Sequence, residues 1–209
     1  AEQKQEVDSL RVNIIRLRAE LSSILIGSHD DWEMQIQINK SVPAYPEDLK
    51  LYAGVMIKQQ QDEYAGRLDN LINQVAIQSQ QIKQREQEIT ELVSKIKTLD
   101  ISYKLASKEL DLTRPLAEKI IVSKIELYKL ERSVNELKGE LNAVRLLSPK
   151  LKSALQESIL SRRESVLFYR AEVRAQLNEL QNKLSRISES QVGAKDKVTK
   201  ALILSPVVG

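Results

Sequence analysis

Apolar residues recur every seven positions from Leu68 to Leu110, and this repeat constrains the fold more than any other feature of the chain. The repeating positions are Leu68, Val75, Ile82, Ile89, Ile96, Tyr103 and Leu110. A companion position, three residues further on, is occupied by Leu71, Gln78, Arg85, Leu92, Leu99 and Ala106. Because a seven-residue repeat keeps one apolar seam on a slightly underwound helix, it predicts a long coiled-coil helix.

A second apolar seam follows in the later part of the chain. Its positions are Leu127, Leu130, Val134, Leu137, Leu141, Val144, Ser148 and Leu151, and after a change of spacing it resumes at Val166, Tyr169, Val173, Gln176 and Leu180. Pro149 lies inside this predicted helix. A proline inside a helix removes one backbone hydrogen bond, so we expect a kink or a loosened turn there.

The two seams mirror each other, as the arms of an antiparallel hairpin must. Six pairs of seam residues have numbers that total 240: Leu110 with Leu130, Tyr103 with Leu137, Leu99 with Leu141, Ile96 with Val144, Ile89 with Leu151, and Leu71 with Tyr169. Each predicted arm has about 67 residues, which at 1.5 Å per residue gives a hairpin roughly 100 Å long. The polar seam residues Gln78, Arg85 and Arg162 predict weaker packing midway along it.

Composition excludes several other architectures. Only 6 Gly and 5 Pro occur in 209 residues, too few for the many turns of a sandwich, a barrel or a doubly wound sheet. The net charge is +3 with both signs interspersed, which argues against a nucleic-acid footprint. The absence of Cys excludes disulfides, thiol nucleophiles and cysteine-bound metals.

A shorter helix precedes the hairpin. Its apolar residues are Val7, Leu10, Ile14, Leu17, Leu21 and Ile24, and Gly27 ends the pattern. A loop over residues 27–46 then returns the chain; Trp32, Met34, Ile36 and Ile38 alternate with polar residues in it, as in an extended segment with one packed face. Since the mirrored pairing already reaches the base of the hairpin, we expect the first helix to form a three-helix bundle there.

The predicted fold is therefore all-α, a long antiparallel coiled-coil hairpin with a basal three-helix bundle. Its predicted segments are a first helix (1–26), a return loop (27–46), an ascending arm (47–114), a tip (115–122), a descending arm (123–193) and a linker leading into a strand (194–209). The last segment has a β-branched character that ends in Pro206-Val207-Val208-Gly209, typical of a strand followed by a turn. Because the chain opens in mid-pattern without Met, we interpret it as a fragment or a processed chain.

Few residues offer catalytic chemistry. His29 is the single His, and Asp30 and Asp31 follow it, but one His with two adjacent carboxylates lacks useful metal-ligand geometry. We expect the other carboxylates to lie at solvated helix positions. The sequence thus predicts no catalytic, cofactor-binding or metal-binding residue and no enzyme.

The tip between the arms is the most informative local site. Ser123 and Glu126 have the spacing of a capping box, flanked by Val122 and Leu127 as a hydrophobic staple. Leu116 falls off the seam. Ile120 and Ile121 add apolar surface, and the charged neighbours are Arg114, Glu118, Lys119 and Lys124. These residues form either a small docking surface or the closing layer of the hairpin.

On these residues the chain resembles the HlyD-type membrane fusion proteins, the periplasmic adaptors of Gram-negative type I secretion systems. The matching stretches are Arg16–Glu20, Tyr45–Leu49, Glu109–Leu116, Val122–Leu127, Leu130–Arg132 and Ser205–Gly209. The resemblance implies that the final stretch is the return strand of a lipoyl-like domain. It also implies a periplasmic location, with an inner-membrane anchor in the full-length protein.

The resemblance further implies the partners. An ABC transporter would contact regions outside this chain, a TolC-like outer-membrane channel would bind the tip, and the adaptor would form a six-fold ring; no nucleic acid is implied. In the family tip motif, Leu116 and Ser123 match the Leu and Ser positions, while Leu112 occupies the Arg position and Arg114 lies two residues later. The predicted partner-binding residues are Arg114, Leu116, Glu118, Lys119, Ile120, Ser123 and Lys124.

Two other functions are compatible with the pattern. One is an adaptor of a multidrug efflux pump. The other is a structural coiled-coil arm unrelated to transport, against which the strand-like end and the patterned tip argue. Flanking lipoyl halves and a membrane anchor would distinguish an adaptor from such an arm.

Overall fold

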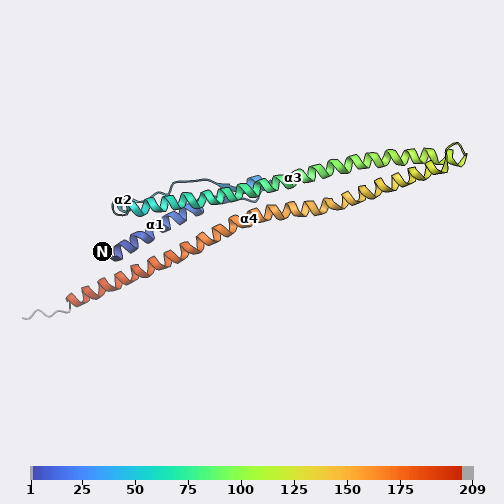
Figure 1. The fold of residues 1–209 in the computed structure, drawn as a ribbon. Coiled ribbons are helices and arrows are strands. Elements are labelled where there is room, and N and C mark those ends of the chain that lie inside the picture. Colours follow the sequence, from blue (N-terminus) through green and yellow to red (C-terminus); the bar gives the residue numbers. More distant parts are fainter. Residues whose placement is uncertain (1, 204–209) are drawn as a thin grey trace, which may run out of the picture. The chain divides into compact units, whose positions relative to one another are not determined.

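The fold was described from a computed structural model, which covers residues 2–203 and the side chains of residues 3–193. The elements in chain order are α1 (Glu2–Ser22), β1 (Ile24–Ile26), η1 (Trp32–Gln35, a 3₁₀ helix), β2 (Ile36–Ile38), α2 (Glu47–Tyr52), α3 (Gly54–Glu118) and α4 (Lys124–Ile203). Figure 1 shows the long helices α3 and α4 running alongside each other. The predicted helical hairpin is therefore confirmed.

The chain divides into two compact units. One, here the bundle unit, contains the described residues up to Ala76 and from Arg162 onward; the other, the tip unit, is Ile77–Ser161. The division falls next to Gln78 and at Arg162, two of the polar seam positions from which weak packing was expected.

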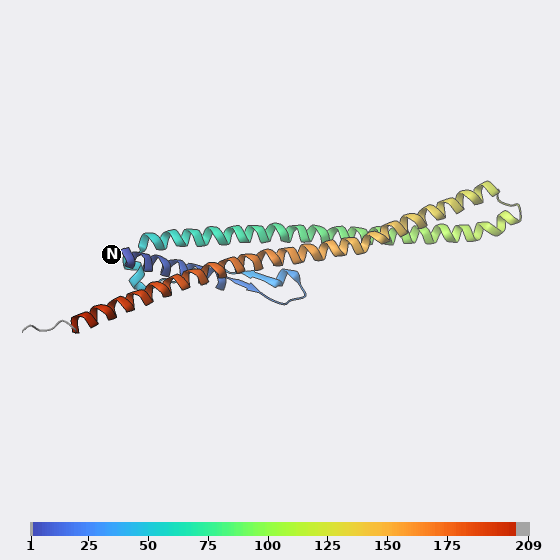
Figure 2. The same cartoon turned by 90° about the horizontal axis from the view of Figure 1, so that it is seen from below.

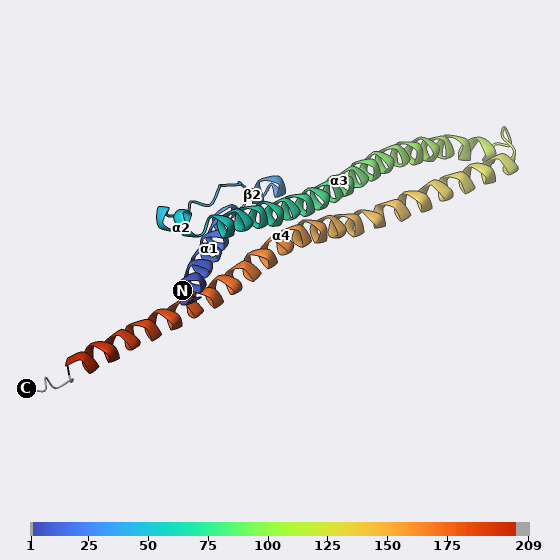
Figure 3. The ribbon, with the colours of Figure 1, turned by 60° about the vertical axis from the view of Figure 1, so that its left-hand side comes forward.

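In the bundle unit, α1 packs against both long helices. Figure 3 shows α1 between α3 and α4. Ile14 and Leu17 of α1 form one apolar cluster with Val173 and Leu177 of α4. A second cluster joins residues of α3, α4 and the two strands: Ile24, Ile36, Tyr64, Leu68, Leu71, Val75 and Val166, with Tyr169 packed against it. The three-helix bundle and the Leu71–Tyr169 pairing are thus both confirmed.

The first helix is shorter than its apolar pattern predicts. α1 ends at Ser22, and Ile24–Ile26 form strand β1, which pairs antiparallel with β2 through Ile24 and Ile38. The hydroxyl groups of Ser22 and Ser23 both donate to the carbonyl oxygen of Ala19, and such side-chain bonds compete with continued helix. Figure 2 shows the two strands beside α4.

The segment around Trp32 is also different from the prediction of an extended chain. Residues 32–35 form η1, whose start is capped by the Asp31 carboxylate, and only Ile36–Ile38 are extended. Trp32 and Ile36 are buried while Met34 is exposed. The packed face therefore contains Trp32, Ile36 and half-buried Ile38, whereas the prediction was wrong for Met34, which the 3₁₀ turn directs to solvent.

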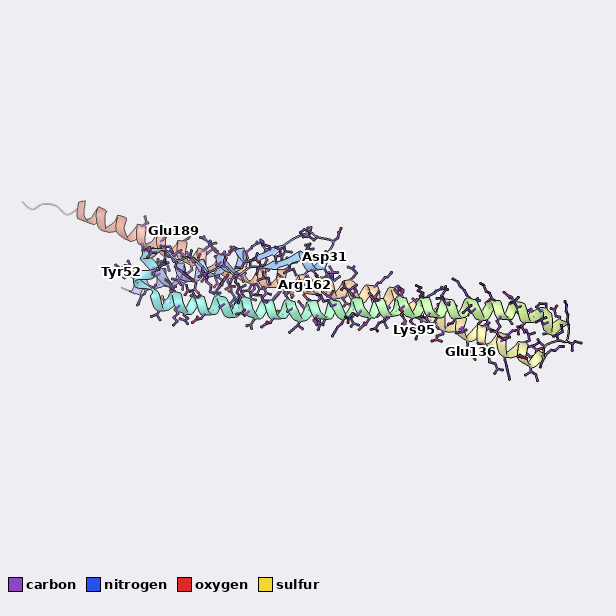
Figure 4. The ribbon with its side chains drawn as sticks, turned by 90° about the horizontal axis from the view of Figure 1, so that it is seen from above. Asp31, Tyr52, Lys95, Glu136, Arg162 and Glu189 are labelled. Atoms are coloured by element: carbon purple, nitrogen blue, oxygen red, sulfur yellow. The ribbon has the colours of Figure 1, made fainter. Side chains whose placement is uncertain are left out.

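Arg162 explains one of the polar seam positions. It is buried, its Nη1 donates to the carbonyl oxygen of Trp32 at 2.8 Å, and its guanidinium lies 5.2 Å from the centre of the Trp32 ring. Burial lowers the pKa of Arg162, and the nearby charge of Glu33 opposes that shift. Figure 4 shows Arg162 close to Asp31, where η1 begins. The arginine thus attaches the small β-hairpin to α4.

The ascending arm begins with a separate short helix. α2 ends at Tyr52, and α3 begins at Gly54, so the predicted segment 47–114 is interrupted at Ala53. Tyr45, Leu49, Ala53 and Ile57 form an apolar cluster with Val12 of α1. This packing fixes the turn between α2 and α3, where Gly54 is a poor helix former.

A buried ionic network crosses the bundle unit. Glu20 of α1 is fully buried, which corrects the expectation that the carboxylates are solvated. It accepts hydrogen bonds from Arg16 of α1, from Arg67 of α3 at 3.2 Å and from the Tyr169 hydroxyl of α4 at 2.7 Å. Burial and the bond to Glu20 raise the pKa of Tyr169. One carboxylate therefore connects all three helices of the bundle.

In the tip unit, ion pairs join α3 and α4 in antiparallel register. Asp100 pairs with Arg145 at 2.9 Å, Lys95 with Glu140 at 3.8 Å, and Arg114 with Glu131 at 3.4 Å. The residue numbers of these pairs total 245, 235 and 245, close to the 240 of the predicted seam. Buried seam residues in this unit include Ile82, Leu110, Val134, Leu141 and Val144.

The descending arm is longer than predicted. α4 continues through Pro149 without interruption and extends to Ile203, so residues 194–203 are helical where a linker and the start of a strand were expected. A single strand without a partner leaves its backbone groups unpaired, whereas a helix satisfies them locally. The remainder of that predicted segment, 204–209, lies outside the described residues.

Candidate functional site at the hairpin tip

The ascending helix does not end at Pro115 but one turn later. α3 continues to Glu118, although the predicted arm ended at residue 114. Pro115 has no backbone N–H to donate, but its carbonyl oxygen still accepts from the N–H of Lys119 at 3.3 Å. The connection between the two long helices is therefore only residues 119–123.

This connection begins with a Schellman motif built on an isoleucine. The N–H of Ile120 donates to the carbonyl oxygen of Ala117 at 3.1 Å, and the N–H of Ile121 donates to that of Leu116 at 2.9 Å. These bonds satisfy carbonyl groups at the end of α3. Ile120 has a φ of 63°, the left-handed region that glycine normally occupies in this motif, and it is the single non-glycine residue with a positive φ in the part of the chain described.

Ser123 caps the descending helix as predicted. Its Oγ accepts a hydrogen bond from the N–H of Ile125 at 3.1 Å, and its carbonyl oxygen accepts from the N–H groups of Glu126 and Leu127. No bond from the Glu126 carboxylate back to Ser123 is formed in the described part of the chain, so only the serine half of the capping box is present. The staple residues Val122 and Leu127 are both half-buried.

The predicted tip residues lie together around this turn. Arg114 reaches across to Glu131 of α4, and Glu118, Lys119, Ser123 and Lys124 are exposed. Ala117 is buried and Val122 and Leu127 are half-buried, which is the burial expected of a closing layer of the hairpin. The other apolar side chains stay exposed: Leu116 by 39%, Ile120 by 90%, Ile121 by 68% and Ile125 by 69%. The closing layer and the exposed apolar residues are thus separate sets.

One apolar surface was not identified from the sequence. Ile101, Leu105, Leu112 and Leu116 are all exposed on α3, with spacings of four, seven and four residues. At 3.6 residues per turn they lie within an arc of about 60°, on the side of the helix away from buried Leu110. This set is called the α3 stripe below. The spacing of four, seven and four residues is a coiled-coil pattern, so the sequence alone could have revealed the α3 stripe.

Away from the tip, the bundle unit has a groove of about 630 Å³. It is lined by five apolar residues, by Arg11 and Arg18, and by the polar residues Gln181 and Ser185, with no carboxylate or histidine. Among the described residues there is no group of three or more His, Cys, Asp or Glu side chains that could hold a metal ion. No described helix is both long enough and apolar enough to cross a membrane.

Taken together, the fold and the tip define a helical-hairpin protein whose distinctive surface lies at the turn between its two long helices. Comparison with known proteins identifies the family. The family profile "AprE, long alpha-helical hairpin" matches residues 1–197, and the chain belongs to that family. No curated protein sequence matches significantly.

A solved structure has the same fold. It is the soluble domain of LipC, a membrane fusion protein of a type I secretion system, with 18% sequence identity and a TM-score of 0.73. The match covers 100% of this chain and 96% of that one. The predicted likeness to membrane fusion proteins is therefore confirmed for the fold.

Proposed function

We propose that this chain is the hairpin part of a periplasmic adaptor in a type I protein secretion system. The observation that carries the proposal is the exposed apolar turn at the end of the hairpin, formed by Leu116, Ile120 and Ile121. Exposed apolar residues surrounded by charged ones are typical of protein interfaces. The likeness to LipC, itself a membrane fusion protein of such a system, supports the same assignment.

In this proposal the adaptor bridges two membranes. The tip binds a TolC-like outer-membrane channel, while regions outside this chain contact an inner-membrane ABC transporter and provide the membrane anchor. The chain's own task is mechanical rather than enzymatic: α3 and α4 present the tip turn to the channel. Arg114, Glu118, Lys119 and Lys124 surround the apolar contact and Ser123 fixes its backbone.

A pull-down tests the channel contact. We expect the full-length protein to retain the purified TolC-like channel of its source organism, and an excess of this chain to compete for that channel. A variant lacking the turn, with residues 112–129 replaced by a short glycine-containing turn, serves as the control. Equal retention of the channel by this control would contradict tip docking.

The proposed assembly is a ring of copies, six-fold as in other adaptors, and the α3 stripe offers a surface for it. A 4-7-4 spacing on the exposed side of α3 matches what a neighbouring helix of a second copy requires. Burying Ile101, Leu105 and Leu112, which leaves Leu116 to the channel contact, would contribute several kcal/mol at about 1.5–3 kcal/mol each, before the cost of association.

A pair of lysine substitutions tests this surface. We expect Leu105→Lys with Leu112→Lys to raise the dissociation constant for self-association of the full-length protein by about tenfold or more, because lysine ammonium groups resist burial. Sedimentation equilibrium measures it. The matched control is Val55→Lys with Ile77→Lys, two exposed apolar positions of α3 outside the stripe. A shift of equal size in both variants would rule out the stripe as the contact.

A further inference from the structure

The residue at the start of the tip turn combines two unfavourable features. Ile120 adopts a φ of 63°, where the Cβ of a β-branched side chain crowds the backbone. Its side chain is also 90% exposed, more than any other large apolar side chain among those described. In the free protein, packing of the Ile120 side chain therefore contributes almost nothing to offset the free-energy cost of its strained backbone.

The turn itself does not require an isoleucine. Both Schellman bonds use backbone atoms, from Ile120 to Ala117 and from Ile121 to Leu116. Glycine forms the same bonds without strain, and asparagine also tolerates the left-handed region. The isoleucine at this position is thus explained neither by the turn's hydrogen bonds nor by the hairpin's core.

We infer that Ile120 is a docking side chain, held at a strained backbone position so that it projects from the turn into an apolar pocket of the outer-membrane channel. The inference rests on the proposed function and identifies a residue that contributes directly to the contact. Strained residues that persist in folded proteins commonly mark binding sites.

The surroundings of Ile120 indicate the chemistry of that pocket. The four residues from Ile120 to Ser123 carry no charged side chain, and Ile121 and Ile125 expose further apolar surface beside it. The bonds to Ala117 and Leu116 hold the turn in one conformation before binding, which reduces the entropy lost on docking. The fitting pocket is therefore uncharged, apolar and wide enough for a branched aliphatic group.

Three substitutions separate strain from contact. Ile120→Gly removes both the strain and the side chain, Ile120→Asn keeps a side chain that is polar, and Ile120→Leu keeps an apolar side chain without β-branching. Hydrogen exchange of the Ile121 amide reports local opening of the turn, because that amide bonds to Leu116. Titration of the full-length protein with the purified TolC-like channel reports docking.

For Ile120→Gly we expect the turn to become more stable while docking to the channel becomes weaker. Exchange of the Ile121 amide slows by about fivefold as strain is relieved, while affinity for the channel falls by about tenfold or more. Ile120→Asn also loses affinity by about tenfold, and Ile120→Leu retains it within about threefold. A residue with only a structural role would change the exchange rate and leave the affinity unchanged.

The outcomes distinguish this inference from the proposed function. If Ile120→Gly binds the channel as tightly as the wild type while Leu116→Asp does not, the docking role of Ile120 is overturned and tip docking stands. If the wild-type protein does not bind the channel, both are overturned.

Discussion

Replacing Leu116 by aspartate is expected to abolish protein export while leaving the hairpin folded. Leu116 ends the α3 stripe and lies beside the turn, with its side chain 39% exposed. A carboxylate at this position would have to be desolvated in an apolar docking contact without a partner. We expect a cost of roughly 3 kcal/mol, or more than a hundredfold in channel affinity. Secreted substrate in the culture medium of a strain carrying only this variant measures the effect.

The fold of that variant is checked independently of its export. The carbonyl oxygen of Leu116 accepts from two amides of the turn, and aspartate keeps that backbone group. A negative charge at the end of a helix costs only about 0.3–1 kcal/mol. Helical circular dichroism at wild-type strength and wild-type abundance in the cell are therefore expected. The matched control is Leu146→Asp, at an exposed leucine of α4, which should export normally. Normal export by a well-expressed Leu116→Asp protein would contradict tip docking.

Long-range periodicity was enough to predict the hairpin but not its exact helix ends. Leu71 and Tyr169, one of the predicted pairs whose residue numbers total 240, pack together in the same apolar cluster. A heptad seam depends on many residues, so no single exception changes it. Helix ends depend on a few local bonds, such as those from Ser22 and Ser23 to Ala19. Ile24 fits both a helical seam and a strand, and only the partner Ile38 decides between them.

The tip was predicted in composition but not in conformation. Ser123 was assigned as the helix cap, because serine oxygens commonly accept from the first amides of a helix. The left-handed φ of Ile120 was not foreseen, since isoleucine strongly disfavours that region and glycine is the expected residue. The left-handed position belongs to the Schellman turn that ends α3, and the strain arises because an isoleucine rather than a glycine occupies it. No local pattern in the sequence encodes it.

Burial of charge was the feature least accessible to the sequence. Arg16 and Glu20 are four residues apart, which on its own describes an ordinary solvated pair on a helix surface. Whether such a pair is buried depends on which helices cover it. In this protein both α3 and α4 cover the pair. The pair also lies within Arg16–Glu20, one of the stretches on which the family resemblance was based. The structure thus gives that stretch a physical role in the bundle unit.

Removing the Glu20 carboxylate is expected to destabilise the bundle unit more than any other single truncation of a charged side chain. In Glu20→Ala, buried Arg16 and half-buried Arg67 lose their shared acceptor, and the Tyr169 hydroxyl loses its partner. Breaking a buried ion pair by deleting one member costs about 3–5 kcal/mol. The carboxylates that remain near the two arginines are partly exposed, Glu63 at 3.4 Å from Arg16 and Glu172 at 3.6 Å from Arg67, and so replace the buried partner only in part. Burial lowers the pKa of Arg67, but the charge of Glu20 and the hydrogen bonds to Tyr169 and Glu20 together raise that pKa above its ordinary value.

Because the chain has a single Trp, the loss of stability in Glu20→Ala can be measured for the bundle unit alone. Trp32 is buried in the bundle unit, so its fluorescence during urea unfolding follows that unit, while circular dichroism follows the helices of both. We expect Glu20→Ala to lower the fluorescence midpoint strongly. The control is Glu6→Ala, which breaks an exposed pair between the same helices, Glu6 with Lys183 at 3.0 Å, and should cost no more than about 1 kcal/mol.

A double substitution decides whether the loss comes from unpaired charge or from lost packing. With Glu20→Leu and Arg16→Met together, the principal buried pair is replaced by aliphatic groups of similar size. Replacing both members of a buried pair is often neutral or stabilising, whereas removing one is costly. We therefore expect the double variant to recover most of the stability that Glu20→Ala loses, with Arg67 turning to its other partner, Glu172. If the double variant is as unstable as Glu20→Ala, the geometry of the network, rather than charge neutralisation, holds α1 between α3 and α4.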